Sequence, residues 1–266
     1  MNTPFTLAVC AEMQFTDLPF IERIKKIHSY GVAVELWNWT DLDLPAIAET
    51  GVPIESMTGY ISGNLTDDNG IEAFLKSAAE SARASKILGS PRLNFHGTGL
   101  GEGGIPVDPV DKVTGRMWAK AALTLEKLAG IAEEHDVIFE MENLNLAVDH
   151  PGTPFSHPSD ILSLLGAVGS DRLKINLDLY HAQIGDGSLI DTCREALPFL
   201  GEVQVADVPG RCEPSTGEIN YRNVGQALVD MGYRGTIALE AWAKYDSDRA
   251  ITTFVDTFSN LKESAK

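Results

Sequence analysis

Short apolar runs alternate along the chain with longer segments in which apolar residues recur at helical spacing. The short runs predict eight β-strands, at residues 5–11, 32–36, 54–58, 92–95, 137–142, 173–178, 202–206 and 236–240. The longer segments predict a helix after each strand. Glycines lie between a predicted helix and the strand that follows it, as expected for helix C-caps or nearby turns: Gly31, Gly51, Gly89, Gly169, Gly201 and Gly232.

Strict alternation of apolar strands and helices is typical of a parallel sheet covered by helices. Eight such units in 266 residues give roughly 33 residues per unit, close to what a (β/α)8 barrel uses. We therefore predict an α/β fold of the TIM barrel type, with a doubly wound open sheet as the competing fold. No Pro/Ser/Gly-rich linker divides the sequence, so residues 1–266 are expected to form one domain.

The composition narrows the classes of function. The chain holds 38 Asp and Glu against 21 Lys and Arg, a formal net charge of −17. A negative net charge disfavours nucleic acids and anionic membranes as partners, because binding to either requires a basic surface. A hydrophobic content of 44% excludes an acidic disordered tail. Three widely spaced cysteines, no signal-like N-terminus and no long apolar run predict a reduced, cytoplasmic protein.

Each of the last four predicted strands carries a polar residue at the same place relative to its carboxyl end. These residues are Glu142, Asp178, Gln204 and Glu240. Because strand side chains alternate between two faces, the four should point together into the mouth of the barrel, where TIM barrels form their active sites. Their apolar neighbours should face the other way: Met141, Leu177, Val205 and Leu239.

Three carboxylates and one amide that converge would repel one another without a counter-ion. Oxygen ligands suit Mg²⁺ or Mn²⁺, and the set lacks the thiolate and imidazole groups of a structural zinc site. We therefore predict one divalent metal ion, with Co²⁺ as a further option. The competing interpretation, four unconnected polar residues held by local hydrogen bonds, is disfavoured by their common phase.

Other polar residues surround the predicted metal site. His181 follows Asp178 by three residues, at the start of the sixth βα loop, and Arg211 lies in the next loop. Imidazole and guanidinium groups suit substrate oxygens or a carboxylate. His96 ends the fourth strand, where a substrate contact and a local structural role are both open. The loops after strands seven and eight are acidic and hold few glycines, which predicts an unphosphorylated substrate.

The segments FEMENLN, KINLDLYHAQ, VQVADVPGRCEPSTGEINY and ALEAW resemble the hydroxypyruvate isomerase branch of the xylose isomerase-like TIM barrels. The resemblance implies one divalent metal and aldose–ketose type isomerisation of small hydroxy-carbonyl compounds, such as hydroxypyruvate/tartronate semialdehyde or a 2-oxo-tetronate. It implies metal ligands at Glu142, Asp178, Gln204 and Glu240, enediolate proton transfer between Glu142 and Glu240, and substrate contacts at His181 and Arg211. It also allows a homo-oligomer.

The substrate stays open at this point, because the first half of the barrel departs from the family pattern. The third strand, ESMTGY, lacks the expected histidine, and the loop FHGTGLGEGG is also unlike the family's. A ketose 3-epimerase acting on free sugars is the main alternative. A phosphodiesterase of the endonuclease IV type would need several histidines for a multi-zinc site, and a non-catalytic sugar-acid binding protein would need no paired glutamates.

Overall fold

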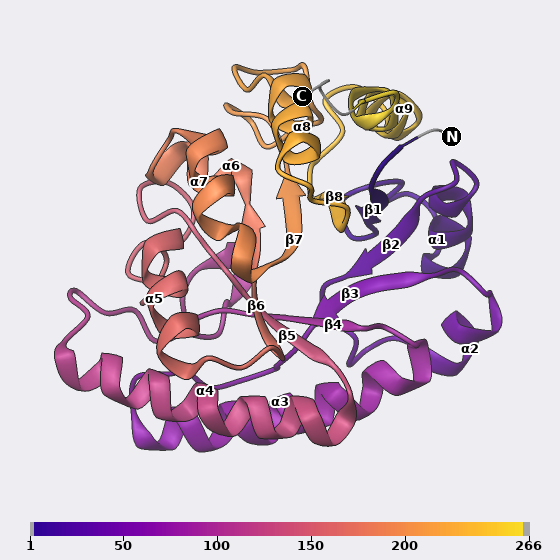
Figure 1. Cartoon of the computed structure of the whole chain (residues 1–266). Helices are drawn as coiled ribbons and strands as arrows, with labels where there is room; N and C mark the ends of the chain where they lie inside the picture. Colours follow the sequence, from indigo (N-terminus) through magenta and orange to yellow (C-terminus); the bar gives the residue numbers. More distant parts are fainter. Residues whose placement is uncertain (1–2, 263–266) are drawn as a thin grey trace.

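The computed structural model describes residues 3–262 and closes eight parallel strands into a barrel in chain order (Figure 1). The predicted (β/α)8 fold is thereby confirmed. The strands are β1 (Thr6–Cys10), β2 (Ala33–Leu36), β3 (Ile54–Thr58), β4 (Arg92–Phe95), β5 (Ile138–Glu142), β6 (Leu173–Asp178), β7 (Leu200–Val205) and β8 (Thr236–Leu239). All eight predicted strands are present, and their ends shift by at most two residues.

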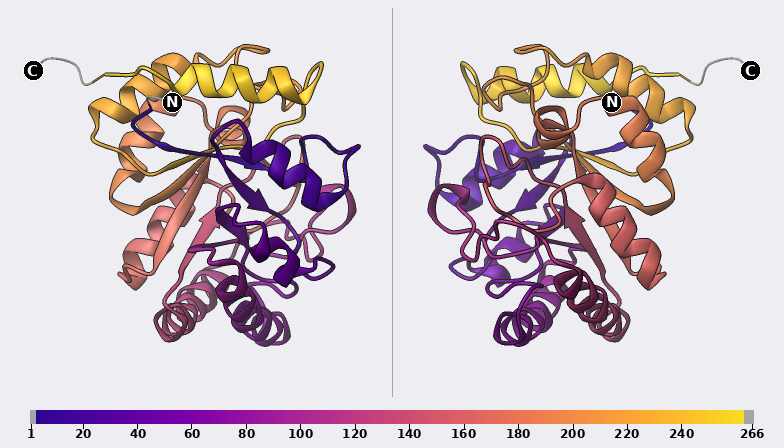
Figure 2. Two further views of the ribbon diagram at one scale, coloured as in Figure 1. Left: turned by 90° about the vertical axis from the view of Figure 1, so that its right-hand side faces the viewer. Right: turned by 90° about the vertical axis from the view of Figure 1, so that its left-hand side faces the viewer.

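Helices surround the barrel. They are α1 (Phe20–His28), α2 (Leu44–Glu49), α3 (Asp68–Leu88), α4 (Gly115–His135), α5 (Pro158–Val168), α6 (Leu179–Gly185), α7 (Leu189–Ala196), α8 (Tyr221–Asp230) and α9 (Ser247–Phe258). The long helices α3 and α4 run side by side along one side of the barrel (Figures 1 and 2). Within residues 3–262 no helix is both long and apolar enough to cross a membrane.

Helix α6 corrects one expectation, because it begins directly after β6, in the segment interpreted as the start of a loop. Asp178 is its N-cap, and Oδ1 of that carboxylate accepts a hydrogen bond from the backbone N–H of His181 at 2.8 Å. A side-chain acceptor of this kind satisfies an N–H that the first helical turn leaves unpaired. His181 is therefore held in the first turn of α6, directly after the end of β6.

Gly201 corrects another expectation, because it lies inside β7 and not at a helix end. A Cβ at this position would overlap the carboxylate of Glu140, which lies on the nearby strand β5. Glycine is thus required here by the close approach of a buried side chain. By contrast, Gly89 and Gly169 are left-handed C-caps of α3 and α5, as predicted.

The apolar core lies between the barrel and the helices. The four residues expected to face away from the mouth are all buried in it: Met141, Leu177, Val205 and Leu239. Inside the barrel, Ala8, Ala33 and Ala238 form a separate small cluster. Polar and charged side chains are buried on β2, β3, β5, β6 and β7, at alternate positions where a strand holds two of them: Glu35, Ser56, Glu140, Glu142, Asn176, Asp178, Glu202 and Gln204. Such groups need hydrogen bonds or counter-charges, which shape the site described next.

Candidate active site

The carboxyl ends of β5 to β8 carry the four predicted metal ligands. Glu142 and Asp178 are the last residues of their strands, Gln204 is paired in register with Asp178, and Glu240 follows the end of β8. Each of the four residues is at most 5% exposed. Burial raises the pKa of Asp178 well above its usual value; Arg211 opposes the shift, and the charges of Glu240 and Glu142 add to it. The structure therefore brings these carboxylates into one electrostatic site.

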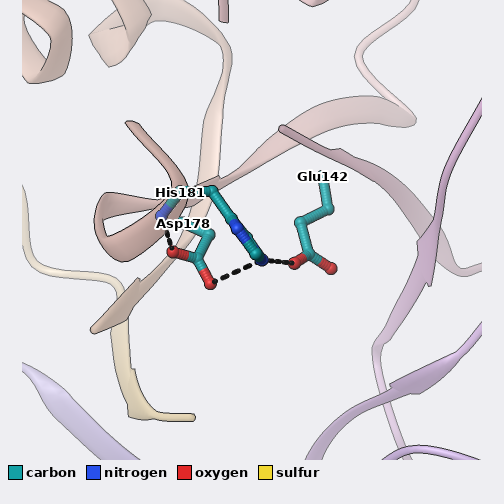
Figure 3. A group of neighbouring side chains, drawn as sticks. All are labelled: Glu142, Asp178 and His181. Carbon is teal, nitrogen blue, oxygen red and sulfur yellow. Dashed lines mark hydrogen bonds and ion pairs between the residues drawn. The ribbon is translucent and has the colours of Figure 1, made fainter. Parts of the chain in front are cut away.

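Glu142, Asp178 and His181 form a group whose ligand atoms all lie within 4.8 Å of one another. Figure 3 shows Nε2 of His181 between the two carboxylates, 3.9 Å from Oε1 of Glu142 and 3.9 Å from Oδ2 of Asp178. His181, expected to contact substrate, thus lies directly at the predicted metal site. Geometry alone leaves this imidazole two roles, as a metal ligand or as a hydrogen-bond donor.

Two buried oxygens of the predicted ligand set have no hydrogen-bond partner within the described residues, namely Oδ2 of Asp178 and Oε1 of Gln204. A buried acceptor without a partner is costly unless an ion or a water molecule satisfies it. Carboxylate and amide oxygens are the ligands that hard divalent cations prefer. The residues present therefore fit the predicted metal ion.

Glu35 orients the amide of Gln204. Nε2 of Gln204 donates to Oε2 of Glu35 at 3.4 Å, and Oγ of Ser56 donates to Oε1 of Glu35 at 2.9 Å. Because the amide nitrogen is used in this way, the amide oxygen is the atom left for the site. Glu35 and Gln204 lie 169 positions apart along the chain, so no local sequence pattern connects them.

Glu142 is held by two donors from the end of β4. Nδ2 of Asn94 and Nε2 of His96 both contact Oε2 of Glu142, the latter at 2.9 Å. Burial raises the pKa of Glu142, but attraction to His96 and the hydrogen bonds from His96 and Asn94 outweigh it, so that the pKa lies below its usual value. His96, predicted to contact substrate, is therefore placed against a predicted catalytic residue.

Glu240 is also held by two donors. Nε1 of Trp37 donates to Oε1 at 2.8 Å, and Nη2 of Arg211 forms an ion pair with Oε2. The same guanidinium nitrogen lies 4.0 Å from Oδ2 of Asp178. Burial raises the pKa of Glu240; Arg211 opposes this shift and Glu142 adds to it. Arg211, predicted to contact substrate, is thus a counter-ion of the predicted metal ligands in this structure.

We expect Trp37→Phe to lower kcat by about 10- to 100-fold, because a hydrogen bond to a charged group contributes about 1.5–3 kcal/mol. The substitution keeps an aromatic ring but removes the N–H that donates to Glu240. Steady-state kinetics check the prediction. Trp242→Phe is the matched control, since the Trp242 ring is 45% exposed and its indole makes no hydrogen bond in the part of the chain described. Equal kcat values for the two variants would contradict the role of Trp37.

Asp207 organises the loop that carries Arg211, a role that no sequence pattern suggested. Its fully buried carboxylate accepts four backbone N–H bonds at 2.9–3.1 Å, from Val208, Thr216, Gly217 and Ile219. Arg211 has a φ of 50°, in the left-handed region that non-glycine residues rarely adopt. The loop hydrogen bonds therefore sustain a backbone conformation that aims Arg211 at Glu240.

We expect Asp207→Asn to lower the free energy of unfolding by about 2–3 kcal/mol, because an amide N–H₂ would face backbone donors and leave them unpaired. We also expect KM to rise, since Arg211 loses its support. Urea denaturation and steady-state kinetics measure the two effects. Asp171→Asn is the control, because Asp171 is exposed. A fully stable Asp207→Asn variant would show that the carboxylate does not organise the loop.

Comparisons with known proteins agree with the observed fold. A family model described as a xylose isomerase-like TIM barrel matches residues 34–262. A putative hydroxypyruvate isomerase of Homo sapiens is 33% identical over 66% of this chain and 62% of that protein. A D-psicose 3-epimerase of Enterocloster bolteae is 31% identical over 46% of this chain and 39% of that protein. The chain thus spans less than two thirds of the length of both curated relatives.

A solved structure supports the fold over nearly the whole length. The crystal structure of an AP endonuclease, family 2, from Brucella melitensis superposes with a TM-score of 0.84. The match covers 96% of this chain and 99% of that chain at 21% sequence identity. Identity at this level shows a shared fold and leaves the chemistry to be argued from the site itself.

Proposed function

Because the chain belongs to the xylose isomerase-like TIM barrel family, we propose that it is a divalent-metal-dependent isomerase of small hydroxy-carbonyl compounds. The proposed substrates are unphosphorylated: hydroxypyruvate with its isomer tartronate semialdehyde, or a 2-oxo-tetronate. The observation that carries the proposal is the pair of buried glutamates, Glu142 and Glu240, each held by two donors beside a buried aspartate. The name of the human relative supports the substrate class.

We propose that Glu142, Asp178, Gln204 and Glu240 hold the metal ion. When bound, a divalent cation supplies Lewis-acid polarisation of the substrate carbonyl. The unpartnered oxygens of Asp178 and Gln204 support this ligand set. Mn²⁺ and Mg²⁺ suit the oxygen ligands, and Co²⁺ is a further candidate.

The two glutamates account for the proton transfers. In hydroxypyruvate, one glutamate takes a proton from the carbon that carries the hydroxyl group, which gives an enediolate. The other glutamate then gives a proton to the former carbonyl carbon, the proton of the hydroxyl group passes to the former carbonyl oxygen, and tartronate semialdehyde results. A carboxylate must lie within hydrogen-bond reach of the proton that it moves, which two glutamates on separate strands allow. The guanidinium of Arg211 suits the carboxylate of such a substrate.

Turnover in deuterated solvent tests the proposal. With Mn²⁺ present, conversion of hydroxypyruvate should place deuterium on the carbon that was the carbonyl, because the second glutamate exchanges its proton with solvent. Nuclear magnetic resonance of the product locates the label. A protein that binds Mn²⁺ but converts neither hydroxypyruvate nor a 2-oxo-tetronate would contradict the proposed isomerisation.

A ketose 3-epimerase is the second candidate, and the similarity to the Enterocloster bolteae protein favours it. An epimerase uses the same paired glutamates, but it removes and returns the proton at one carbon. Deuterium would then appear at the inverted centre of a free ketose such as D-psicose. The position of the label therefore separates the two functions.

The proposal includes a single domain in the cytoplasm. Within residues 3–262, the eight strands from Thr6 to Leu239 all belong to one closed barrel, which supports a single domain. Cys10, Cys193 and Cys212 are all free, which suits a reducing compartment.

A further inference from the structure

The hydrogen on the ring of His181 decides what this residue can do. Nε2 of His181 is buried, lies between the carboxylates of Glu142 and Asp178, and has no hydrogen-bond partner among the described residues (Figure 3). If Nε2 carries the hydrogen, the ring donates to a molecule that binds beside these carboxylates. If Nε2 carries only its lone pair, the ring is available as a metal ligand.

The orientation of Asn145 is fixed by its hydrogen bonds. Oδ1 of Asn145 accepts the backbone N–H groups of Val148 and Asp149, both at 3.0 Å. Nδ2 donates to Oδ2 of Asp149 at 2.6 Å, and it lies 2.7 Å from Nδ1 of His181. A flipped amide would set its hydrogens against two backbone N–H groups and its oxygen against a carboxylate. The amide therefore has one satisfied orientation, in which all four of its hydrogen bonds are used.

This orientation assigns the hydrogens of the His181 ring. Because an N–H of Asn145 points at Nδ1, this nitrogen must accept and carries no hydrogen. A neutral ring then has its hydrogen on Nε2, and a doubly protonated ring would place two N–H groups against each other. The doubly protonated ring is therefore disfavoured by the hydrogen bond from Asn145.

Neighbouring rings keep the imidazole from turning over. The rings of His150 and Tyr180 pack against it in edge-on geometry, with centroids 5.0 and 5.1 Å away. The backbone N–H of His181 is bound to Asp178, which fixes the start of the side chain. Nδ1 and Nε2 consequently keep their separate surroundings.

We propose that Asn145 is a positioning residue that keeps the hydrogen of His181 on Nε2, so that His181 donates a hydrogen bond to a substrate oxygen and is not a metal ligand. Coordination through Nε2 would force the hydrogen onto Nδ1, directly against the N–H of Asn145. The donor role rests on the proposed function, which identifies the substrate. The position of the ring hydrogen is independent of that function, because it follows from the protein's own hydrogen bonds.

The test exchanges the amide and the carboxylate that flank the ring. In the double variant Asn145→Asp/Asp149→Asn, the side chain at 145 keeps an oxygen for the two backbone N–H groups, but it offers the ring an acceptor. The total charge is unchanged, and the two side chains still complement each other. Asp149→Asn alone is the matched control, because it leaves the amide at 145 in place.

Nuclear magnetic resonance of protein labelled with ¹⁵N in its histidine rings shows which ring nitrogen carries hydrogen. We expect Nε2–H in the wild type and in Asp149→Asn, both metal-free and with Zn²⁺, a diamagnetic ion that favours imidazole ligands. We expect Nδ1–H in the exchanged variant. A wild-type ring with its hydrogen on Nδ1, or with Nε2 bound to Zn²⁺, would overturn the proposal even if the exchanged variant failed to fold.

Turnover of hydroxypyruvate with Mn²⁺ tests the donor role. We expect kcat of the exchanged variant to fall about 100-fold relative to Asp149→Asn, the loss typical of one removed donor in an active site. A variant that moves the hydrogen but keeps its kcat would show that His181 does not donate to the substrate. If the wild type has Nε2–H but converts no hydroxypyruvate, the assignment of the ring stands and the proposed substrate fails.

Discussion

Glutamine in place of Glu142 or Glu240 is expected to lower kcat for hydroxypyruvate by about 10³- to 10⁴-fold. An amide does not accept a proton from carbon, and general acid–base catalysis by one group contributes about 10²- to 10⁴-fold. The amide also meets the wrong partners, since Asn94 and His96 donate to Glu142, while Trp37 and Arg211 donate to Glu240. Each substitution thus removes the proton carrier and disturbs the group that positions it.

The measurement is steady-state kinetics on protein whose metal content has been determined. Metal content matters because both glutamates are also proposed ligands, so lost turnover must be separated from lost metal. Glu133→Gln is the control, because Glu133 lies exposed on α4 and its charge is removed without any contact to the site. A metal-replete variant at position 142 or 240 that keeps a tenth of the wild-type kcat would exclude that glutamate as a proton carrier.

Removal of divalent metal is expected to abolish turnover, and added Mn²⁺ should restore it. Three carboxylates that are buried together gain a counter-charge when a cation binds, and binding to the folded state alone stabilises it by about 2.7 kcal/mol at 100 times Kd. We therefore expect Mn²⁺ to raise the Tm of the chelator-treated protein. We also expect Asp178→Asn to weaken Mn²⁺ binding by at least about 10-fold, since its unpartnered Oδ2 is lost as an anionic ligand.

Isothermal titration calorimetry and thermal unfolding measure these effects. Asp171→Asn serves again as the control, because it removes one aspartate charge from an exposed position after α5. Full turnover after exhaustive chelation, with a Tm that Mn²⁺ leaves unchanged, would exclude the metal site. Loss of binding in Asp178→Asn alone, by contrast, would support the ligand role of that residue directly.

The site residues at the strand ends could be predicted from the sequence because, in a (β/α)8 barrel, the position of a residue along its strand determines where its side chain lies. A polar residue at the same point of four successive strands has to lie on one face at one end of the sheet, and neighbours such as Met141 and Leu177 confirm the phase by being buried outside the barrel. The eight strands follow from the same alternation. Periodicity is informative here because side chains alternate between the two faces of every strand, and apolar residues recur at helical spacing in every helix.

The groups that orient the site could not be predicted in this way. Trp37 and Glu240 are 203 positions apart, and Asn145 and His181 are 36 positions apart. Nothing in the local sequence distinguishes the donors, Trp37 and Asn145, from other loop residues that carry an N–H group. Asp207 binds backbone N–H groups, which every sequence supplies, so no side-chain pattern marks it. Helix α6 could not be predicted because it is short and its N-cap, Asp178, is also the last residue of β6.

The interior consists of an apolar shell between the barrel and the helices and of mostly polar side chains inside the barrel. This arrangement affects how the chain can evolve. The shell joins strands and helices in one apolar cluster, which also includes buried loop residues such as Tyr60, Leu65 and Phe155. Substitutions at exposed positions of the loops above the strand ends can therefore change which small molecule is accepted while the folding free energy stays nearly constant, whereas buried loop residues such as Asp207 are needed for stability. New specificities are accessible to such a chain by exchange of a few residues around a fixed pair of glutamates.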